Sequence, residues 1–363
     1  MTSYGKNIKI EVFGGSHDSE IGIKAAGIPA GITVDTERLN KFMQRRAPGQ
    51  SKLTTSRKEP DVPEFVSGFD GNTTNGEPIE IIIRSVNMRS GDYDSLKNTP
   101  RPSHADYPAA VKSSGNADLR GGGHFSGRLT APICALGGIL KAELEKRGIF
   151  IGAHIESIGS VLDFRFDPIG VCKDDFDAIL SNTLPVLDAK AGEKMAEYID
   201  GARMKLDSVG GVIECAVVGL PVGLGEHMFG GMESRISSAI FSIPAVKGIE
   251  FGAGFASTDM YGSANNDPFF FDGGKVKTKT NNCGGILGGM TNGMPLIFRC
   301  AVKPTPSIGI EQDSVNLETG ENTKITIHGR HDPCIVTRAV PVVEAMCAIA
   351  VFDASLDEGE MEK

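Results

Sequence analysis

The sequence predicts one large domain, spanning residues 1–363, in which α-helices and β-strands are mixed. Its length is sufficient for a sizeable core, and 40% hydrophobic with 23% charged residues is ordinary for a globular protein. Apolar residues recur at a period of two in some stretches and at helical spacing in others. The 46 glycines also indicate many tight turns and close approaches of the backbone.

The N-terminal part of the chain is expected to contain a strand, a helix and a second strand. Residues 7–13 alternate apolar and polar, which is typical of a strand with one solvated face. A helix is predicted over about 36–45, because this stretch has a polar start and stops before Pro48 and Gly49. Residues 79–84, which are mostly isoleucine, predict a buried strand.

The rest of the chain alternates between the two kinds of element. Leu129, Ile133 and Leu136 have helical spacing, and Gly148 is a suitable stop for that helix. Pro341 suits the first turn of the last helix. Helices are predicted over about 129–148, 173–206 (two segments broken near Pro185), 232–243 and 341–354, and strands over 151–161, 210–220, 295–302 and 324–328.

Three segments are expected to lie outside regular structure. They are a mobile loop near 38–58, a long polar loop near 262–283 and a short polar tail from about 356. Long loops of this kind in a compact domain are usually functional or disordered. The segment 38–58 holds seven basic residues and no acidic one, although the whole chain has a net charge of −9. This pattern favours a small anionic ligand over a polyanion.

Composition argues against several classes of protein. The acidic net charge disfavours a nucleic-acid binder, whose phosphate contacts need a basic surface. No apolar run approaches the length of a bilayer span and no N-terminal signal is evident, so a cytoplasmic protein without a membrane partner is expected. The seven cysteines form no CxxC pair, and HExxH is absent, so no metal site is expected. The fingerprints GxGxxG and GxxxxGK[ST] are also missing.

The stretch from Arg101 to Thr130 concentrates the residues suited to chemistry. His104 and Asp106 follow an Arg-Pro turn, and three glycines precede His124 and Arg128. A glycine-rich loop that leads into a helix presents free backbone N–H groups and the positive end of the helix dipole. The stretch therefore favours a site for a phosphate or a carboxylate.

Other candidate residues are weighed against simpler roles. His17 follows a strand and two glycines, where it can serve in acid–base chemistry or lie as a turn residue in solvent. Arg46, Lys52 and Arg57 can clamp an anion or form a solvated basic face. Residues 303–308 can grip a phosphate or form an ordinary surface turn. The cluster Arg330, His331 and Asp332 can belong to a site or to a surface salt bridge. His154 is expected to be a packing or turn residue.

The order of the motifs resembles that of the chorismate synthase family over essentially the whole chain. The matching stretches are GGSHD (14–18), RRAPGQS (45–51), RPSHADY (101–107), RGGGHFSGRLT (120–130), VGLGE (222–226), SIPAVKGIEFGAGF (242–255), GGILGG (284–289), KPTPSI (303–308), GRHDPC (329–334) and RAVPVVEAM (338–346). Each motif is modest alone, but this many in the same order is specific.

The resemblance implies an α+β fold, a β-α-β sandwich with helices packed between antiparallel sheets, and a cytoplasmic homotetramer. It also implies a lyase that converts 5-enolpyruvylshikimate 3-phosphate to chorismate and phosphate by 1,4-anti elimination, the last step of the shikimate pathway. Reduced FMN is the implied cofactor, which such a reaction needs although it is redox-neutral. Some members of the family reduce the flavin themselves with NAD(P)H and others depend on an outside source.

Site residues follow from the resemblance position by position. His17, His104 and Asp332 match the catalytic residues. Arg46, Lys52, Arg101, Arg128 and Arg330 match positions that hold the anions of the substrate. The positions that match FMN contacts are His124, Phe125, Ser126, Pro244, Ala245, Gly288, Lys303, Pro304, Thr305, Pro306, Ser307 and Arg330.

The chain departs from the usual family pattern at several of these positions. Gly15 and Asp18 stand where glutamate and glycine are usual, and Ser103 stands where glycine is usual. His124 and Pro244 replace an arginine and an asparagine. The departures concern the contacts to FMN more than the catalytic side chains, which are all retained. The alternative hypothesis is therefore a flavin- or anion-binding protein of the same fold whose catalysis is lost or altered. A hydrolase would need a metal or a nucleophile constellation that the sequence lacks.

Overall fold

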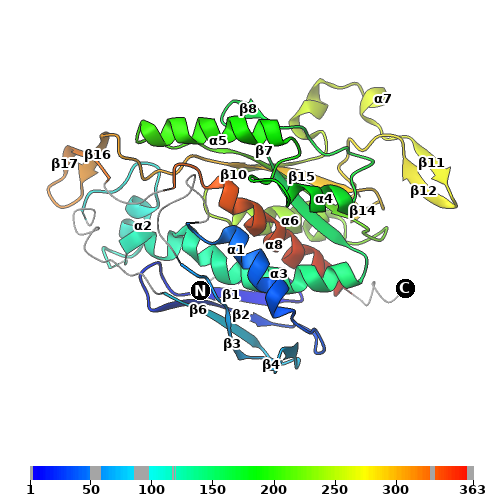
Figure 1. The fold of residues 1–363 in the computed structure, drawn as a ribbon, viewed down its shortest axis with the longest axis horizontal. Helices are drawn as coiled ribbons and strands as arrows, with labels where there is room; N and C mark the ends of the chain where they lie inside the picture. Colours follow the sequence, from blue (N-terminus) through cyan, green and yellow to red (C-terminus); the bar gives the residue numbers. More distant parts are fainter. Residues whose placement is uncertain are drawn as a thin grey trace.

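Two antiparallel sheets enclose a layer of helices, as Figure 1 shows. The computed structural model describes residues 3–49, 59–85, 98–116, 118, 120–327 and 332–357. The sandwich arrangement confirms the predicted fold class. Among the described residues, no helix has both the length and the apolar character needed to span a bilayer.

The first sheet has four strands in the order β1-β2-β6-β3. It is held by alternate isoleucines, such as Ile23 and Ile81, whose side chains are fully buried against the helices. The strand predicted over 79–84 is confirmed, whereas the second strand of the sheet, over 20–26, was not predicted. The four strands are β1 (Lys9–Phe13), β2 (Glu20–Ala26), β6 (Ile79–Arg84) and β3 (Glu64–Ser67).

The second sheet has five strands in the order β10-β15-β9-β7-β8. Its strands pair antiparallel throughout, and the predicted strands over 151–161, 210–220 and 295–302 correspond to three of them. The five strands are β10 (Val246–Phe251), β15 (Leu296–Val302), β9 (Gly211–Val218), β7 (Phe150–Ile158) and β8 (Val161–Leu162).

Between the sheets lies a layer of four helices. The two longest pack at very close range, because a Cβ added to Gly137 would lie 2.5 Å from the Cβ of Ala345. Only glycine allows this approach of the two backbones. The helices are α1 (Thr36–Arg46), α3 (Thr130–Lys146), α6 (Met232–Phe241) and α8 (Val336–Ser355).

The predicted start of the last helix at Pro341 is wrong. Helix α8 begins five residues earlier, and Pro341 lies inside its second turn. A proline there removes one backbone hydrogen bond. The helix tolerates this loss because nearly all of its residues are buried between α3 and the five-stranded sheet, so packing outweighs the local preference.

Two helices cover the outer face of the five-stranded sheet near β7, as Figure 1 shows. They are α4 (Lys173–Ile179) and α5 (Ala189–Met204). The second begins at the N-cap Asp188, whose side chain accepts a hydrogen bond from the backbone N–H of Lys190. The prediction of two helical segments broken near Pro185 is thus confirmed.

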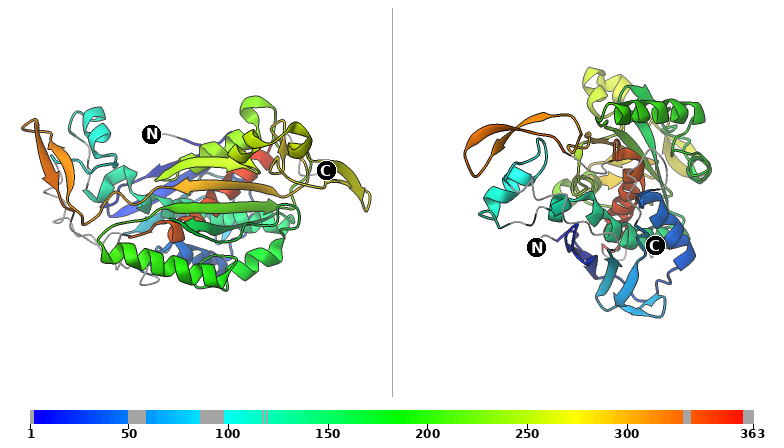
Figure 2. Two further views of the ribbon diagram at one scale, coloured as in Figure 1. Left: turned by 90° about the horizontal axis from the view of Figure 1, so that it is seen from above. Right: turned by 60° about the vertical axis from the view of Figure 1, so that its left-hand side comes forward.

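Smaller elements decorate the sandwich, and Figure 2 shows the hairpins β11–β12 and β16–β17 projecting from its opposite ends. Four are hairpins, two are short helices and the others are 3-10 turns. They are β4 (Phe69–Asp70), β5 (Thr73–Thr74), α2 (Asp106–Lys112), 3-10 turns at Arg120–Phe125, Gly127–Leu129, Met228–Gly230 and Gly254–Asp259, α7 (Gly262–Asn265), β11 (Phe269–Asp272), β12 (Lys275–Thr278), β13 (Ile286–Leu287), β14 (Met290–Thr291), β16 (Gln312–Asn316) and β17 (Glu321–Ile325).

These elements correct three predictions. The long loop expected near 262–283 contains α7 and the hairpin β11–β12, because the Phe269–Phe271 run pairs with β12. Residues 38–46 of the expected mobile loop belong to α1, and residues 50–58 lie outside the described part of the chain. The strand expected over 324–328 ends at Ile325 and is the second half of a hairpin.

Candidate active site

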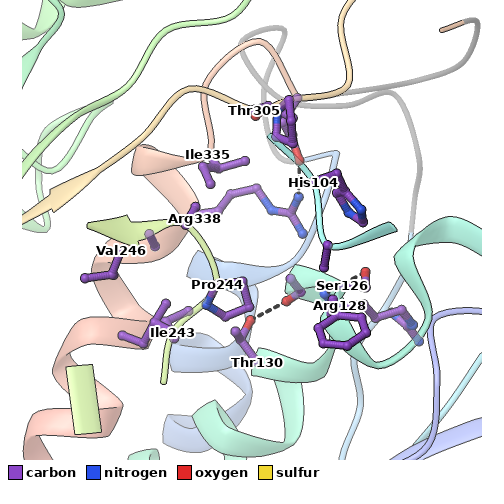
Figure 3. A pocket seen from close by; sticks show the side chains of 18 of the residues that line it. His104, Ser126, Arg128, Thr130, Ile243, Pro244, Val246, Thr305, Ile335 and Arg338 are labelled. Atoms are coloured by element: carbon purple, nitrogen blue, oxygen red, sulfur yellow. Dashed lines mark hydrogen bonds and ion pairs between the residues drawn. The ribbon is translucent and has the colours of Figure 1, made fainter. Parts of the chain in front are cut away.

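Segments distant in sequence meet around a cavity of about 700 Å³. It is bounded by the end of α1, the loop before α2, the glycine turn before α3, the turn before β10, the loop after β15 and the start of α8 (Figure 3). Most of the predicted site residues line it: Arg46, Arg101, His104, His124, Phe125, Ser126, Arg128, Pro244, Ala245, Lys303, Thr305, Pro306, Ser307 and Asp332.

Five predicted site residues do not line this cavity as described. His17 lies just behind its wall. Pro304 is outside the lining, and Gly288 lies at the turn of the hairpin β13–β14. Lys52 and Arg330 fall outside the described residues. Within the described part of the chain, no group of three or more His, Cys, Asp or Glu side chains could hold a metal ion.

His104 belongs to a compact hydrogen-bonded group with Arg101 and Asp106. Its Nδ1 lies 2.6 Å from Oδ1 of Asp106 and 3.1 Å from Nη2 of Arg101. Arg101 also donates to Asp106 from Nε at 2.7 Å and from Nη2 at 2.8 Å, and to the hydroxyl of Ser307 at 3.2 Å. Burial raises the pKa of Asp106, but the hydrogen bonds from Arg101 and His104 outweigh it and hold that pKa well below its usual range. Asp106 is therefore a carboxylate at neutral pH.

A tight turn carries His104 to the cavity. The backbone N–H of His104 donates to the carbonyl of Arg101, with Pro102 and Ser103 between them. Ser103 has φ of 58°, which a type II turn requires at its third position and which favours glycine. The serine at this position is thus held in a conformation that costs free energy.

Arg46 and Arg128 share a pair of buried carboxylates. Asp61 accepts from Arg46 and, at 3.0 Å, from Nη1 of Arg128, and Glu59 lies 3.8 Å from Nη2 of Arg128. Arg46 also donates to Thr130 at 3.2 Å. Such pairs fix guanidinium groups in place before a ligand arrives.

Acids outside the basic segment compensate its arginines. No acid occurs over 38–58, and this absence favoured an anion clamp in the sequence. The structure instead pairs Arg46 with Asp61, Arg45 with Glu344 and Arg38 with Glu145. Glu59 and Asp61 lie within three residues of the end of that segment.

Arg338 was not predicted as a site residue. It reaches from the first turn of α8 toward the cavity on the side where His104 lies, as Figure 3 shows. Its Nη1 lies 2.6 Å from Oδ2 of Asp332, and its Nε donates to the carbonyl of Arg46 at 3.0 Å. Arg338 therefore ties the predicted catalytic acid to the end of α1. The sequence does not predict this role, because Arg338 lies three residues before Pro341, where the helix was expected to start.

The glycine turn before α3 links the cavity to the segment before β2. The backbone N–H of Ser16 donates to the carbonyl of Gly123 at 3.2 Å, and Nδ1 of His124 donates to the carbonyl of Gly14 at 2.8 Å. A Cβ on Gly121 would lie 2.5 Å from Nε2 of His17. The ring of His17 consequently packs on this turn. Its neighbour in sequence, Ser16, lines the cavity.

The loop after β15 supplies a cation and two hydroxyls. The ammonium of Lys303 donates to the carbonyl of Ser103, and desolvation together with the neighbouring Lys247 lowers its pKa. The hydroxyl of Thr305 is buried and has no hydrogen-bond partner among the described residues. A buried hydroxyl at a cavity wall is available to a ligand.

A second proline turn forms the opposite wall. The backbone N–H of Val246 donates to the carbonyl of Ile243 at 3.3 Å, and Ala245 has φ of 75°. Pro244 and Ala245 therefore occupy the middle of a type II turn whose third position favours glycine. The N–H of Lys303 donates to the carbonyl of Ala245 at 3.0 Å, which joins this turn to the loop after β15.

Comparison with known proteins gives a consistent result. The family described as chorismate synthase matches residues 8–356. A chorismate synthase from Lancefieldella parvula is 44% identical over 97% of this chain and 96% of its own length, and one from Thermococcus kodakarensis is 43% identical over 96% of each chain. A crystal structure of chorismate synthase superposes with a TM-score of 0.76 at 28% identity, covering 98% of this chain and 93% of the other. The chain therefore belongs to the chorismate synthase family of enzymes.

Proposed function

We propose that the protein converts 5-enolpyruvylshikimate 3-phosphate to chorismate and phosphate by 1,4-anti elimination, with reduced FMN as cofactor. The observation that carries this proposal is the shared cavity, where two proton-handling groups, His104 and Asp332, lie among side chains that suit an anionic ligand. The proposed reaction requires both kinds of group, because it removes one ring proton and releases one phosphate.

The residues around the cavity fit a phosphate-bearing planar cofactor. Its volume of about 700 Å³ lies within the range usual for ligand sites. Lys303 and the buried hydroxyl of Thr305 offer donors to a phosphate or a ring carbonyl, and the half-exposed Phe125 offers an apolar face. Ser126, Pro244 and the other predicted contacts are proposed to complete this surface. When bound, reduced FMN would supply the reversible electron donation that side chains cannot provide.

The arginines are proposed to hold the anions of the substrate. Arg46 and Arg128 are fixed by Asp61, so their remaining N–H groups are oriented before binding. Arg101 contributes from the opposite loop. Lys52 and Arg330, which lie outside the described residues, are proposed to complete the set.

Proton handling is assigned to three side chains. His17, which packs on the glycine turn, is proposed to protonate the leaving phosphate. Asp332, paired with Arg338, is proposed to accept the ring proton, and His104 to hold a proton at the cavity face. The phosphate leaves as its bond to the ring breaks, and the C–H bond breaks with it. The ring double bond that lies between these two centres is replaced by two conjugated double bonds, one ending at each centre.

We further propose that the protein is a cytoplasmic homotetramer. Light scattering of the purified protein tests the assembly, since a monomer or dimer mass would contradict it. Whether the protein reduces FMN with NAD(P)H is decided by following NAD(P)H oxidation in the presence of FMN.

The function is tested by anaerobic turnover. Purified protein with 5-enolpyruvylshikimate 3-phosphate and chemically reduced FMN is expected to form chorismate and phosphate in equal amounts. Binding of FMN without release of phosphate would instead support a flavin-binding protein without catalysis.

A further inference from the structure

Asp106 lies at the centre of the loop that presents His104, and the sequence motifs assign it no specific role. Its carboxylate is buried and accepts from four donors of the same short segment. Oδ2 accepts from the backbone N–H of Arg101 at 3.0 Å and from its Nε at 2.7 Å, and Oδ1 accepts from Nη2 at 2.8 Å. The fourth contact is the Nδ1 atom of His104 at 2.6 Å.

The contacts at Nδ1 select one form of the neutral imidazole ring. Arg101 at 3.1 Å would need a lone pair on Nδ1, whereas Asp106 at 2.6 Å needs a hydrogen there. A carboxylate cannot donate, so a lone pair facing it at 2.6 Å would be repelled. Nη2 of Arg101 already donates to Oδ1 of Asp106. The shorter, charge-assisted contact therefore determines the tautomer, with the hydrogen on Nδ1.

This tautomer leaves Nε2 as the atom that faces the site. A Cβ on Gly122 would lie 3.4 Å from Nε2 of His104, so this edge of the ring points at the glycine turn. His104 and Gly121, which precedes Gly122, both line the cavity. In the neutral ring, Nε2 then carries a lone pair and can accept a hydrogen bond or a proton.

We propose that Asp106, held by Arg101, is the positioning residue that fixes the Nδ1–H tautomer of His104 and directs its Nε2 into the cavity. Asp106 acts through His104 and does not touch the substrate. Arg101 orients Asp106, so its positive charge is matched inside the loop. The consequence for turnover rests on the proposed function, whereas the tautomer does not.

The decisive measurement is the state of the His104 ring in the free protein. Long-range ¹H–¹⁵N spectra of protein labelled at histidine distinguish the two tautomers, and comparison with His104→Gln assigns one of the seven histidine signals. At a pH where the ring is neutral, the signal is expected to show hydrogen on Nδ1. Hydrogen on Nε2 would overturn the proposal, whether or not the protein makes chorismate.

Asp106→Asn tests the link to turnover. The amide keeps the size but loses the charge, so the tautomers are expected to mix and kcat to fall about 10- to 100-fold, with KM nearly unchanged and a displaced pH profile. Asp272→Asn, on the remote hairpin β11–β12, is the matched control and should leave kcat unchanged. An unaltered tautomer and kcat in Asp106→Asn would overturn the proposal. If that variant does not fold, the wild-type tautomer still decides. If no form of the protein makes chorismate, the proposed function fails and the tautomer result stands.

Discussion

His17 and His104 contact two successive glycines of the turn before α3. A Cβ at Gly121 would meet the ring of His17, and one at Gly122 would meet the ring of His104. Both glycines have positive φ, so a side chain at either would be strained, and at Gly121 it would also be crowded. A single backbone turn therefore spaces the two histidines to which proton handling is assigned in the proposed function.

Removal of either ring is expected to affect turnover more than binding. His17→Ala and His104→Ala should each lower kcat by about 10² to 10⁴-fold, because each ring is proposed to handle a proton rather than to hold the substrate. The measurement is steady-state turnover with chemically reduced FMN. The exposed His227, changed to alanine, is the control and should retain full activity. A large rise in KM at constant kcat would show that the two rings serve in binding.

Ala245 carries backbone strain at the cavity wall. Its φ of 75° belongs to a region that alanine rarely adopts, whereas glycine enters it freely. Ala245→Gly is expected to raise the free energy of unfolding by about 1 kcal/mol, after the greater flexibility of glycine in the unfolded chain is counted. Ala253→Gly is the matched control, because Ala253 has φ of −65° and should lose stability instead. Equal losses in both variants, measured by urea unfolding, would contradict the strain at Ala245.

At the scale of the elements, the contact between α3 and α8 depends on a single missing methyl group. Gly137→Ala would place a Cβ within 2.6 Å of the Ala345 backbone, so the helices must separate. The expected loss of stability is about 1 to 3 kcal/mol. Gly201→Ala in α5 is the control, because a Cβ there meets nothing within 4 Å and alanine is the better helix former. The thermal midpoint should fall in the first variant and rise in the second.

The elements predicted best are those whose local pattern agrees with their packing. Residues 79–84 and the two helices around Pro185 follow from periodicity and a break, and they lie where expected. The strand Glu20–Ala26 was missed because Gly22 and two alanines weaken its strand signal, although it lies in the middle of the sheet. The sequence predicts too short a last helix, because a proline is typical of the first turn of a helix. Only the burial of α8 between two layers explains why Pro341 lies inside it.

Many residues around the candidate site were predictable from the sequence, but Arg338 and the pairings between side chains were not. Sequence motifs place His104, Arg128 and Asp332 among the site residues, and the structure brings them to one cavity. Motifs do not show that Asp106 binds the ring of His104 or that Arg338 binds Asp332. Such partners depend on side-chain direction and on contacts between distant segments, which spacing along the chain does not encode.

At the scale of the whole molecule, a row of ionisable side chains crosses the five-stranded sheet and connects it to the segment before α5, which covers its outer face. His154 on β7 lies opposite Glu214 on β9, which lies opposite Arg299 on β15, which lies opposite Glu250 on β10. Nε2 of His154 is 2.9 Å from Glu214, and its Nδ1 is 3.3 Å from Asp163. Asp163 also accepts from the backbone N–H groups just before α5. The expectation that His154 is a packing residue is therefore confirmed by its full burial, with an ionic role in addition.

The histidine between two carboxylates makes this connection dependent on pH. Burial lowers the pKa of His154, but the hydrogen bonds to Asp163 and Glu214 outweigh it and raise the pKa above its usual value. The pKa of Asp163 is lowered, since its bonds to His154 and to the backbone outweigh its burial. The stabilisation from His154 is thus fully present below about pH 6.5 and is lost as pH rises through the raised pKa. That from Asp163 is present above about pH 4 and is lost as pH falls through the lowered one.

His154→Gln should therefore lose stability in a pH-dependent manner. Removal of one partner from a buried ionic group costs about 3 to 5 kcal/mol, because Asp163 and Glu214 keep their charges without the cation. The difference in thermal midpoint between wild type and variant is expected to be largest near pH 6 and to shrink as pH rises through the raised pKa of His154. His227→Gln on the surface should show no such trend. A difference that stays constant from pH 6 to pH 9 would mean that His154 does not change its charge over this range, so that the link between the sheet and α5 does not depend on the titration of this ring.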